Sequence, residues 1–118
     1  MIIRTLTIPS GASVSNGDSY VNANVLQNMG NQLFPVAIKC PAALTTDTTF
    51  TVEWEYETGQ WSEIRASNGA SDPKTFTAHA TIPFDSLVIA FLKDKTIRVK
   101  VTTEQDDPRV FELHYAAI

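Results

Sequence analysis

The sequence has a single cysteine and no long apolar run. Cys40 has no second cysteine to pair with, so no disulfide cross-links the chain. The longest apolar stretch, "SLVIAFL" at residues 86–92, is far shorter than the roughly 20 residues that a membrane-spanning helix needs, so we expect it to belong to the core. The start, "MIIRTLTIPSGAS", is too short and too quickly interrupted for a signal peptide. We therefore expect a chain that folds in the cytosol and has no membrane partner.

Basic clusters and catalytic motifs are also missing. The net charge is −4, and no Lys/Arg cluster offers a footprint for nucleic acid or an anionic membrane. The two histidines, His79 and His114, are far apart in the sequence, which contains no G-x-S-x-G, no phosphate-binding Gly-rich loop and no H-E-x-x-H. Because an enzyme needs a clustered nucleophile, base and orienting group, we predict a protein that is not an enzyme and uses no cofactor.

A group of acidic residues raises the question of metal binding. Glu104, Asp106 and Asp107 share one loop, and carboxylates are calcium ligands. The loop lacks the glycine and the distant glutamate of known calcium loops, so we expect a solvated acidic turn and no metal. Cys40 is expected to be a small buried hydrophobe. His114 shares strand parity with Glu112 and is expected on a solvent-facing side.

What the sequence does contain is a series of short alternating segments. At 118 residues and 43% apolar content, the chain fits one domain covering residues 1–118, and Met1 directly before a strand-like segment predicts a complete small gene product. We expect strands at residues 2–8, 33–39, 50–57, 60–65, 75–81, 96–103 and 109–117, a helical turn near 84–88, and short strands and loop in the Ser/Asn/Gly-rich residues 11–32. Pro35 restricts its strand to a sheet edge or to one end of the segment. This pattern predicts an all-β fold, an antiparallel β-sandwich or jelly roll.

The clearest segment is "FTVEWEYETGQWSEIR" at residues 50–65. Phe50, Val52, Trp54 and Tyr56 alternate with polar residues, which predicts a strand with one buried face. Gly59 can adopt the left-handed conformation that closes a three-residue loop at residues 57–59. In that register, the expected opposite pairs are Tyr56 with Gln60, Trp54 with Ser62, and Val52 with Ile64.

The other face of this hairpin combines acidic residues with one large aromatic. Glu53 lies opposite Glu63, and like charges in such pairs are mildly destabilising. One interpretation is a solvated face that aids solubility. A second is a partner-binding surface in which Trp61 is the anchor and the partner's Lys or Arg residues meet the glutamates. A third is a sugar that stacks on Trp61. Each of these interpretations predicts that Trp61 is exposed. The candidate binding residues are Trp61, Glu53, Glu55, Glu63 and Arg65.

The order of segments adds a resemblance. "TLTIPSGASVS", "LFPVAIKCPAALTTDTTFTVEWEYETGQWSEI" and "TIPFDSLVIAFLKDKTIRVKV" precede a hydrophobic last strand. This order resembles small β-sandwich proteins encoded near the capsid genes of tailed bacteriophages. The matching residues are Pro41, Ala42 and Ala43, then Thr49, Phe50 and Val52, then Gly59 and Trp61. The sequence departs from that pattern by "ETG" in place of a "DGG"-like turn and by "VIAFLK" in place of a strand of small residues.

The resemblance implies a virion structural protein, assembled in the host cytoplasm, that is a head decoration or minor capsid protein and binds the outside of the shell. Its partner would be the major capsid protein or another virion protein, and such proteins form symmetric homo-oligomers, often trimers. Residues 1–10 are a candidate pairing arm, although we favour a first strand that closes its own sandwich. The alternative function is a carbohydrate-binding module of a phage fibre or tail that uses Trp61 as a stacking platform.

Overall fold

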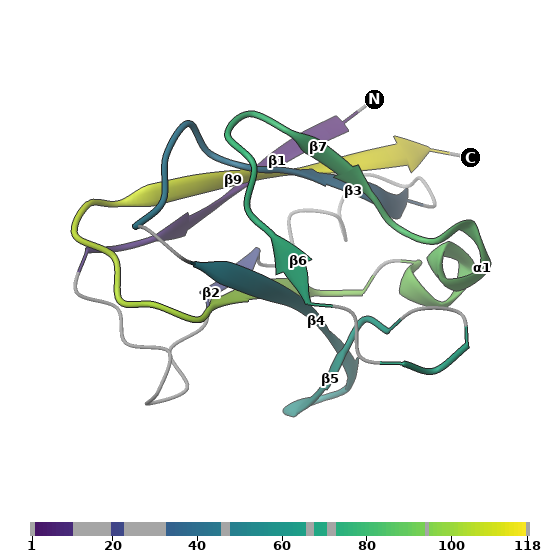
Figure 1. Ribbon diagram of the computed structural model, residues 1–118. Coiled ribbons are helices and arrows are strands. Elements are labelled where there is room, and N and C mark those ends of the chain that lie inside the picture. Colours follow the sequence, from purple (N-terminus) through teal and green to yellow (C-terminus); the bar gives the residue numbers. More distant parts are fainter. Residues whose placement is uncertain are drawn as a thin grey trace.

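The computed structural model describes residues 2–10, 20–22, 33–45, 48–65, 68–70, 73–93 and 95–117. In these residues the elements follow in the order β1 (Ile2–Ile8), β2 (Tyr20–Asn22), β3 (Leu33–Lys39), β4 (Thr49–Glu57), β5 (Gln60–Glu63), β6 (Lys74–Thr75), β7 (Thr81–Pro83), α1 (Ser86–Ile89), η2 (Ala90–Leu92), β8 (Ile97–Val101) and β9 (Arg109–Ala117). The strands form two antiparallel sheets that face each other (Figure 1). The predicted all-β sandwich is confirmed.

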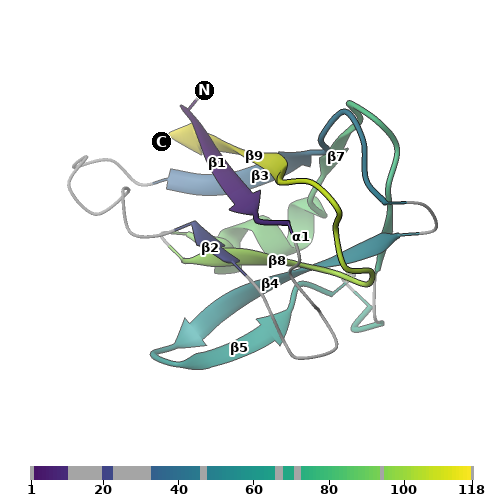
Figure 2. The same cartoon turned by 90° about the vertical axis from the view of Figure 1, so that its left-hand side faces the viewer.

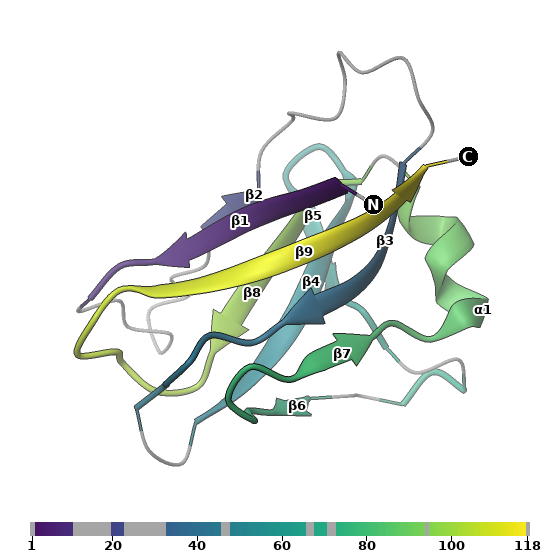
Figure 3. The same ribbon diagram turned by 90° about the horizontal axis from the view of Figure 1, so that it is seen from above.

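Sheet A has the strand order β1-β9-β3-β7 (Figure 3). β1 pairs with β9 along its whole length, from Ile2 opposite Tyr115 to Ile8 opposite Arg109. The first strand therefore lies in the sheet of its own chain, as we favoured. β3 is an internal strand, and β7 pairs with its residues 37–39. Pro35 lies ahead of that segment, next to an irregularity in the pairing with β9, so it occupies one end of the strand.

Sheet B has the order β2-β8-β4-β5, and β6 also pairs with β4 (Figure 2). β8 pairs with β4 from Val101 opposite Phe50 to Ile97 opposite Trp54. The Ser/Asn/Gly-rich residues 11–32 contribute β2, and the rest of that expected loop lies outside the described residues.

The core lies between the two sheets and follows the alternation of side chains along each strand. In β9, Phe111, Leu113 and Tyr115 are buried, whereas Glu112 and His114 on the opposite side are partly exposed. The rings of Phe50 in sheet B and Phe111 in sheet A are 5.2 Å apart and tilted by 59°, so they join the two layers. The same parity holds in β8. Its buried residues are Ile97, Val99 and Val101.

The expected strand at residues 75–81 is wrong. Lys74 and Thr75 pair with β4 in sheet B, whereas β7 belongs to sheet A. The chain crosses between the layers through a turn in which the amide of Ala80 donates to the carbonyl of Thr77 and His79 has a φ of 61°. The turn interrupts the strand between the two sheets, and the alternation of these residues did not reveal the crossing.

A short helical segment lies at one end of the sandwich (Figures 1 and 3). α1 and η2 together begin at Ser86, slightly later than the predicted turn, and Phe84 and Leu92 anchor the segment in the core. Among the described residues, no helix has the length and apolar character required to cross a membrane.

Candidate interaction surface

The β4–β5 hairpin forms as its alternation predicted, with one difference at the turn. Trp54 lies opposite Ser62, and the amide of Ile64 donates to the carbonyl of Val52 over 2.7 Å. Glu57 pairs with Gln60, so the loop has two residues, and an irregularity at Tyr56 replaces the expected Tyr56–Gln60 pair. The extra residue is a β-bulge, which explains how a shorter loop keeps the predicted register further along the strands.

Two features close this turn. Gly59 has a φ of 76°, the left-handed conformation that the sequence required there. Its amide donates to Oε2 of Glu55 over 2.9 Å. One of the proposed binding carboxylates therefore stabilises the turn of its own hairpin.

The outer face of the hairpin contains an unexpected cation, Arg98 of β8. Its Nε lies 2.6 Å from Oε1 of Glu53, and its guanidinium carbon lies 4.2 Å from the centroid of the Trp61 ring. Both side chains of the ion pair are mostly buried, with exposed fractions of 25% for Arg98 and 19% for Glu53. Arg98 therefore supplies from the chain itself the positive charge that the partner-binding interpretation assigned to a partner.

This contact corrects the expectation that Trp61 is exposed. Trp61 is half-buried, and Arg98 covers part of its ring. Less of the ring is left for a sugar to stack on or for a partner to bury. Trp61 still lies opposite Glu55, on the outer face that the alternation predicted.

The remaining candidates are spread along the same hairpin. Glu63 lies opposite Glu53, as expected, and is half-buried. Arg65 is exposed beyond the end of β5, and its Nη1 donates to the carbonyl of Gly69 over 3.3 Å. The structure thus brings all five predicted residues onto one hairpin or its end, and internal contacts are seen for Glu53, Glu55, Trp61 and Arg65.

The inner face of the hairpin is more exposed than the sequence suggested. Towards its tip the hairpin turns away from sheet A (Figure 1), and Tyr56, which we predicted on the buried side, has 41% of its surface exposed. Trp54 is half-buried, with its ring 5.9 Å from that of Tyr56 and 5.9 Å from Nζ of Lys95. An aromatic surface therefore lies where we expected core.

A hollow of about 220 Å³ lies between this aromatic surface and the helical segment. The hairpin side contributes Trp54 and Ile64, and the helical side contributes Phe91 and Leu92. Phe91 has 68% of its surface exposed, more than any other large apolar side chain in the described residues. Sequence reasoning missed Phe91 because the run "SLVIAFL" was assigned to the core as a whole.

A second hollow, of about 490 Å³, lies next to Cys40 and His79. Burial raises the pKa of the Cys40 thiol above its ordinary value of 9.0, and a hydrogen bond with the backbone of Thr77 lowers it less. The thiol is therefore protonated at neutral pH and is a poor nucleophile. Lys39 and Glu112 face each other across β3 and β9 at this hollow. The arrangement gives no support for catalysis.

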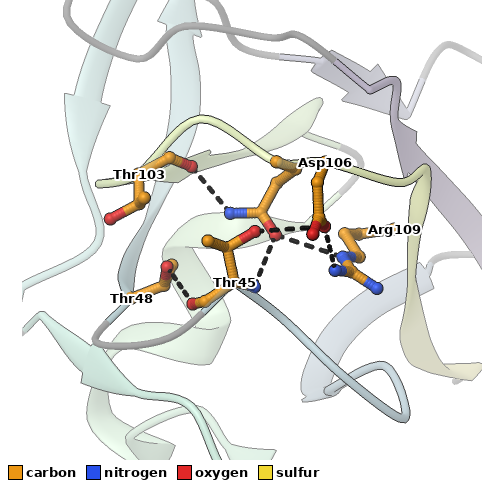
Figure 4. A network of polar contacts seen from close by, with 6 residues as sticks. Thr45, Thr48, Thr103, Asp106 and Arg109 are labelled. Carbon is orange, nitrogen blue, oxygen red and sulfur yellow. Dashed lines mark hydrogen bonds and ion pairs between the residues drawn. The ribbon is translucent and has the colours of Figure 1, made fainter.

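The acidic loop near this hollow forms a structural network (Figure 4). Oε1 of the buried Gln105 accepts from the amide of Thr45 over 3.0 Å and from Nε of Arg109 over 3.1 Å, and its Nε2 donates to the carbonyl of Thr103 over 2.7 Å. Asp106 forms an ion pair with Arg109 at 2.7 Å. The network joins the loop after β8 to the connection before β4.

His114 and the acidic side chains were the other candidates considered for a site. Nε2 of His114 lies 3.2 Å from Oε1 of Glu112 on the outer face of β9, the side we predicted for both. Within the described residues, no group of three or more His, Cys, Asp or Glu side chains is arranged to hold a metal ion.

Comparison of the chain with protein-family models, with curated proteins and with solved structures gave no match. The resemblance in segment order and the contacts described above are therefore the basis for assigning a function.

Proposed function

We propose that the protein is a non-enzymatic structural protein of a tailed-bacteriophage virion, a head decoration protein that binds the outside of the capsid. The main support for the proposal is the position of the segments on which the resemblance depends. "TF-x-V", the turn at Gly59 and the aromatic after the turn form one hairpin, with Trp61 on its outer face. A sandwich fold serves many functions, so the fold alone is neutral evidence.

The outer face of the hairpin supports binding to a basic surface. It combines Glu53, Glu55, Glu57 and Glu63, and Arg98 forms an ion pair with Glu53. Glu57 is exposed at the tip, where a Lys or Arg of another protein can reach it. Complementary charge at such a rim raises the association rate and selects the partner more than it raises affinity. A capsid protein with a basic outer patch is the partner that this surface fits.

The first strand offers a second contact. Among the described strands, β1 is the end strand of sheet A, and its outer side can accept an extended segment of a neighbouring protein through main-chain hydrogen bonds. This use leaves the β1–β9 pairing intact. In this contact a partner's strand is added to the existing sheet edge. β1 does not leave its own sheet as an exchanged arm.

The test is rebinding to capsids. Purified protein is mixed with virions from which its gene has been deleted and is then sedimented with them. We expect saturable co-sedimentation that Glu57→Lys weakens about tenfold, a change of roughly 1.4 kcal/mol, because the substitution reverses a charge at the contact. Lys74→Glu reverses a charge at the far end of sheet B and is the matched control. Absence from the pellet at all concentrations, or glycan binding that Trp61→Ala abolishes, would contradict the proposal.

A further inference from the structure

The hollow beside Phe91 reaches the hydrophobic core. Two of its lining residues, Ile64 and Leu92, are buried members of the core cluster, and a third, Val88, packs against that cluster. An apolar side chain inserted here would therefore contact core residues directly.

The chemistry of the lining indicates what kind of group fits. Ile64, Val88 and Leu92 offer no hydrogen-bond partner, so a sugar hydroxyl placed against them would lose water without compensation. An aromatic or branched apolar side chain has no such cost and gains about 25 cal/mol for each Å² removed from water. These three residues therefore favour an apolar side chain over a carbohydrate as the occupant.

The rim of the same hollow has a protruding apolar side chain. Phe91 is 68% exposed, and Tyr56, next to Trp54 on the hairpin, is 41% exposed. Large exposed aromatics beside a hollow are typical of the centre of a protein interface. The rim also contains charges of both signs, Glu63 and Arg65.

We propose that a second copy of this chain docks on this patch, with Phe91 of each copy in the hollow of the other. A two-fold symmetric contact uses the same patch on both copies, so the patch must be complementary to itself. This patch meets that requirement, because it has a protruding side chain beside a hollow and a negative charge beside a positive one. The contact uses the inner side of the hairpin and the helical segment, whereas capsid binding is proposed for the outer face, and Glu63 lies at the border of the two surfaces.

The first test is the mass of the purified protein across a concentration series, measured by sedimentation equilibrium. We expect a dimer whose dissociation constant rises about a hundredfold or more in Phe91→Ala, because the substitution removes both inserted rings. Phe91 is mostly exposed, so the variant should keep its fold. Val110→Ala, on the outer face of sheet A, removes a side chain that is 45% exposed and is the matched control.

A mixing experiment tests the reciprocal arrangement. Val88→Trp fills the hollow but leaves Phe91 in place, whereas Phe91→Ala leaves the hollow open. Each variant alone is expected to be monomeric, and an equimolar mixture is expected to form a heterodimer with one inserted ring. If Val88→Trp does not fold, as judged by circular dichroism, Arg65→Trp, at an exposed position on the rim, provides a second way to fill the hollow.

The outcomes separate the proposal from its alternatives. A monomer at all concentrations, a mass of three chains, or a dimer that Phe91→Ala leaves intact and Val110→Ala weakens would each overturn it. Tryptophan emission gives an independent readout, since dimerisation should shift the Trp54 signal towards the blue. The shift should be absent from Trp54→Phe and retained in Trp61→Phe, and the opposite result would also overturn the proposal.

Discussion

Arg98 and Glu53 are joined across neighbouring strands of sheet B, with Nε of Arg98 2.6 Å from Oε1 of Glu53. The register places Arg98 opposite Glu53 on one side, and Glu63 opposite Glu53 on the other. A positive charge therefore stands in the same row as two negative ones. This arrangement explains how the hairpin tolerates facing glutamates, whose mutual repulsion would otherwise be slightly destabilising.

Removing Arg98 should expose that repulsion. We expect Arg98→Ala to lower the free energy of unfolding by about 1–2 kcal/mol, because it removes a partly buried ion pair and the contact with the Trp61 ring. Arg98→Lys should recover part of the loss, since it restores the charge without the planar group. Urea denaturation followed by circular dichroism measures both. Lys100→Ala, opposite Thr51 on the same strand, is the control, and an equal loss there would show that the ion pair adds nothing.

The hairpin shows how far local pattern predicts structure. The alternation correctly placed Trp54 opposite Ser62 and Glu53 opposite Glu63, because strand parity and a nearby turn are properties of contiguous residues. The contact of Arg98 with Glu53 was not predictable from the same reasoning. It requires knowing that β8 lies beside β4, and the two residues are 45 positions apart in the sequence. The outward parity of Arg98 was the available signal.

The turn itself gives a second prediction. Gly59 has a φ of 76°, and a Cβ added there would meet no atom within 4 Å, so a substitution would cost backbone strain without a clash. Gly59→Ala is expected to lower the free energy of unfolding by about 1–2 kcal/mol, the cost of the left-handed conformation for an L-residue. Gly59→Asn should cost less, since asparagine tolerates that conformation better. Equal costs for the two variants, measured by thermal unfolding, would argue against this explanation.

Burial was the harder property to predict. The parity of Tyr56 and Trp54 is right, but an inward direction buries a side chain only where another layer covers it. Sheet A does not cover the tip of the hairpin, and Tyr56 remains 41% exposed. The extent of coverage depends on the lengths and crossing of the two sheets, which no single segment encodes. Phe91 was misplaced for the same reason.

Gln105 should be important for stability although nothing in the sequence singled it out. Its side chain is 1% exposed and bonds to Thr45, Thr103 and Arg109. Gln105→Ala leaves the amide of Thr45 and Nε of Arg109 without this acceptor, so we expect a loss of about 2–3 kcal/mol. Faster hydrogen exchange at the Thr45 amide should accompany the loss. Glu104→Gln, at the exposed neighbouring position, is the control, and an unchanged exchange rate at Thr45 in Gln105→Ala would contradict the assignment.

Cys40 predicts how stability depends on alkaline pH. Burial raises the pKa of its thiol in the folded protein, so above the ordinary value of 9.0 the unfolded chain loses this proton more readily than the folded one. The folded state then binds more protons, and the free energy of unfolding falls as the pH rises from about that value through the higher pKa of the folded state. Other groups titrate in the same range, so the measurement must be a difference. Cys40→Ala should show a shallower decline than the native chain in urea denaturation at pH 8 to 10.5. Parallel declines would mean that the thiol ionises equally easily in both states, and burial would then have no effect on its proton affinity.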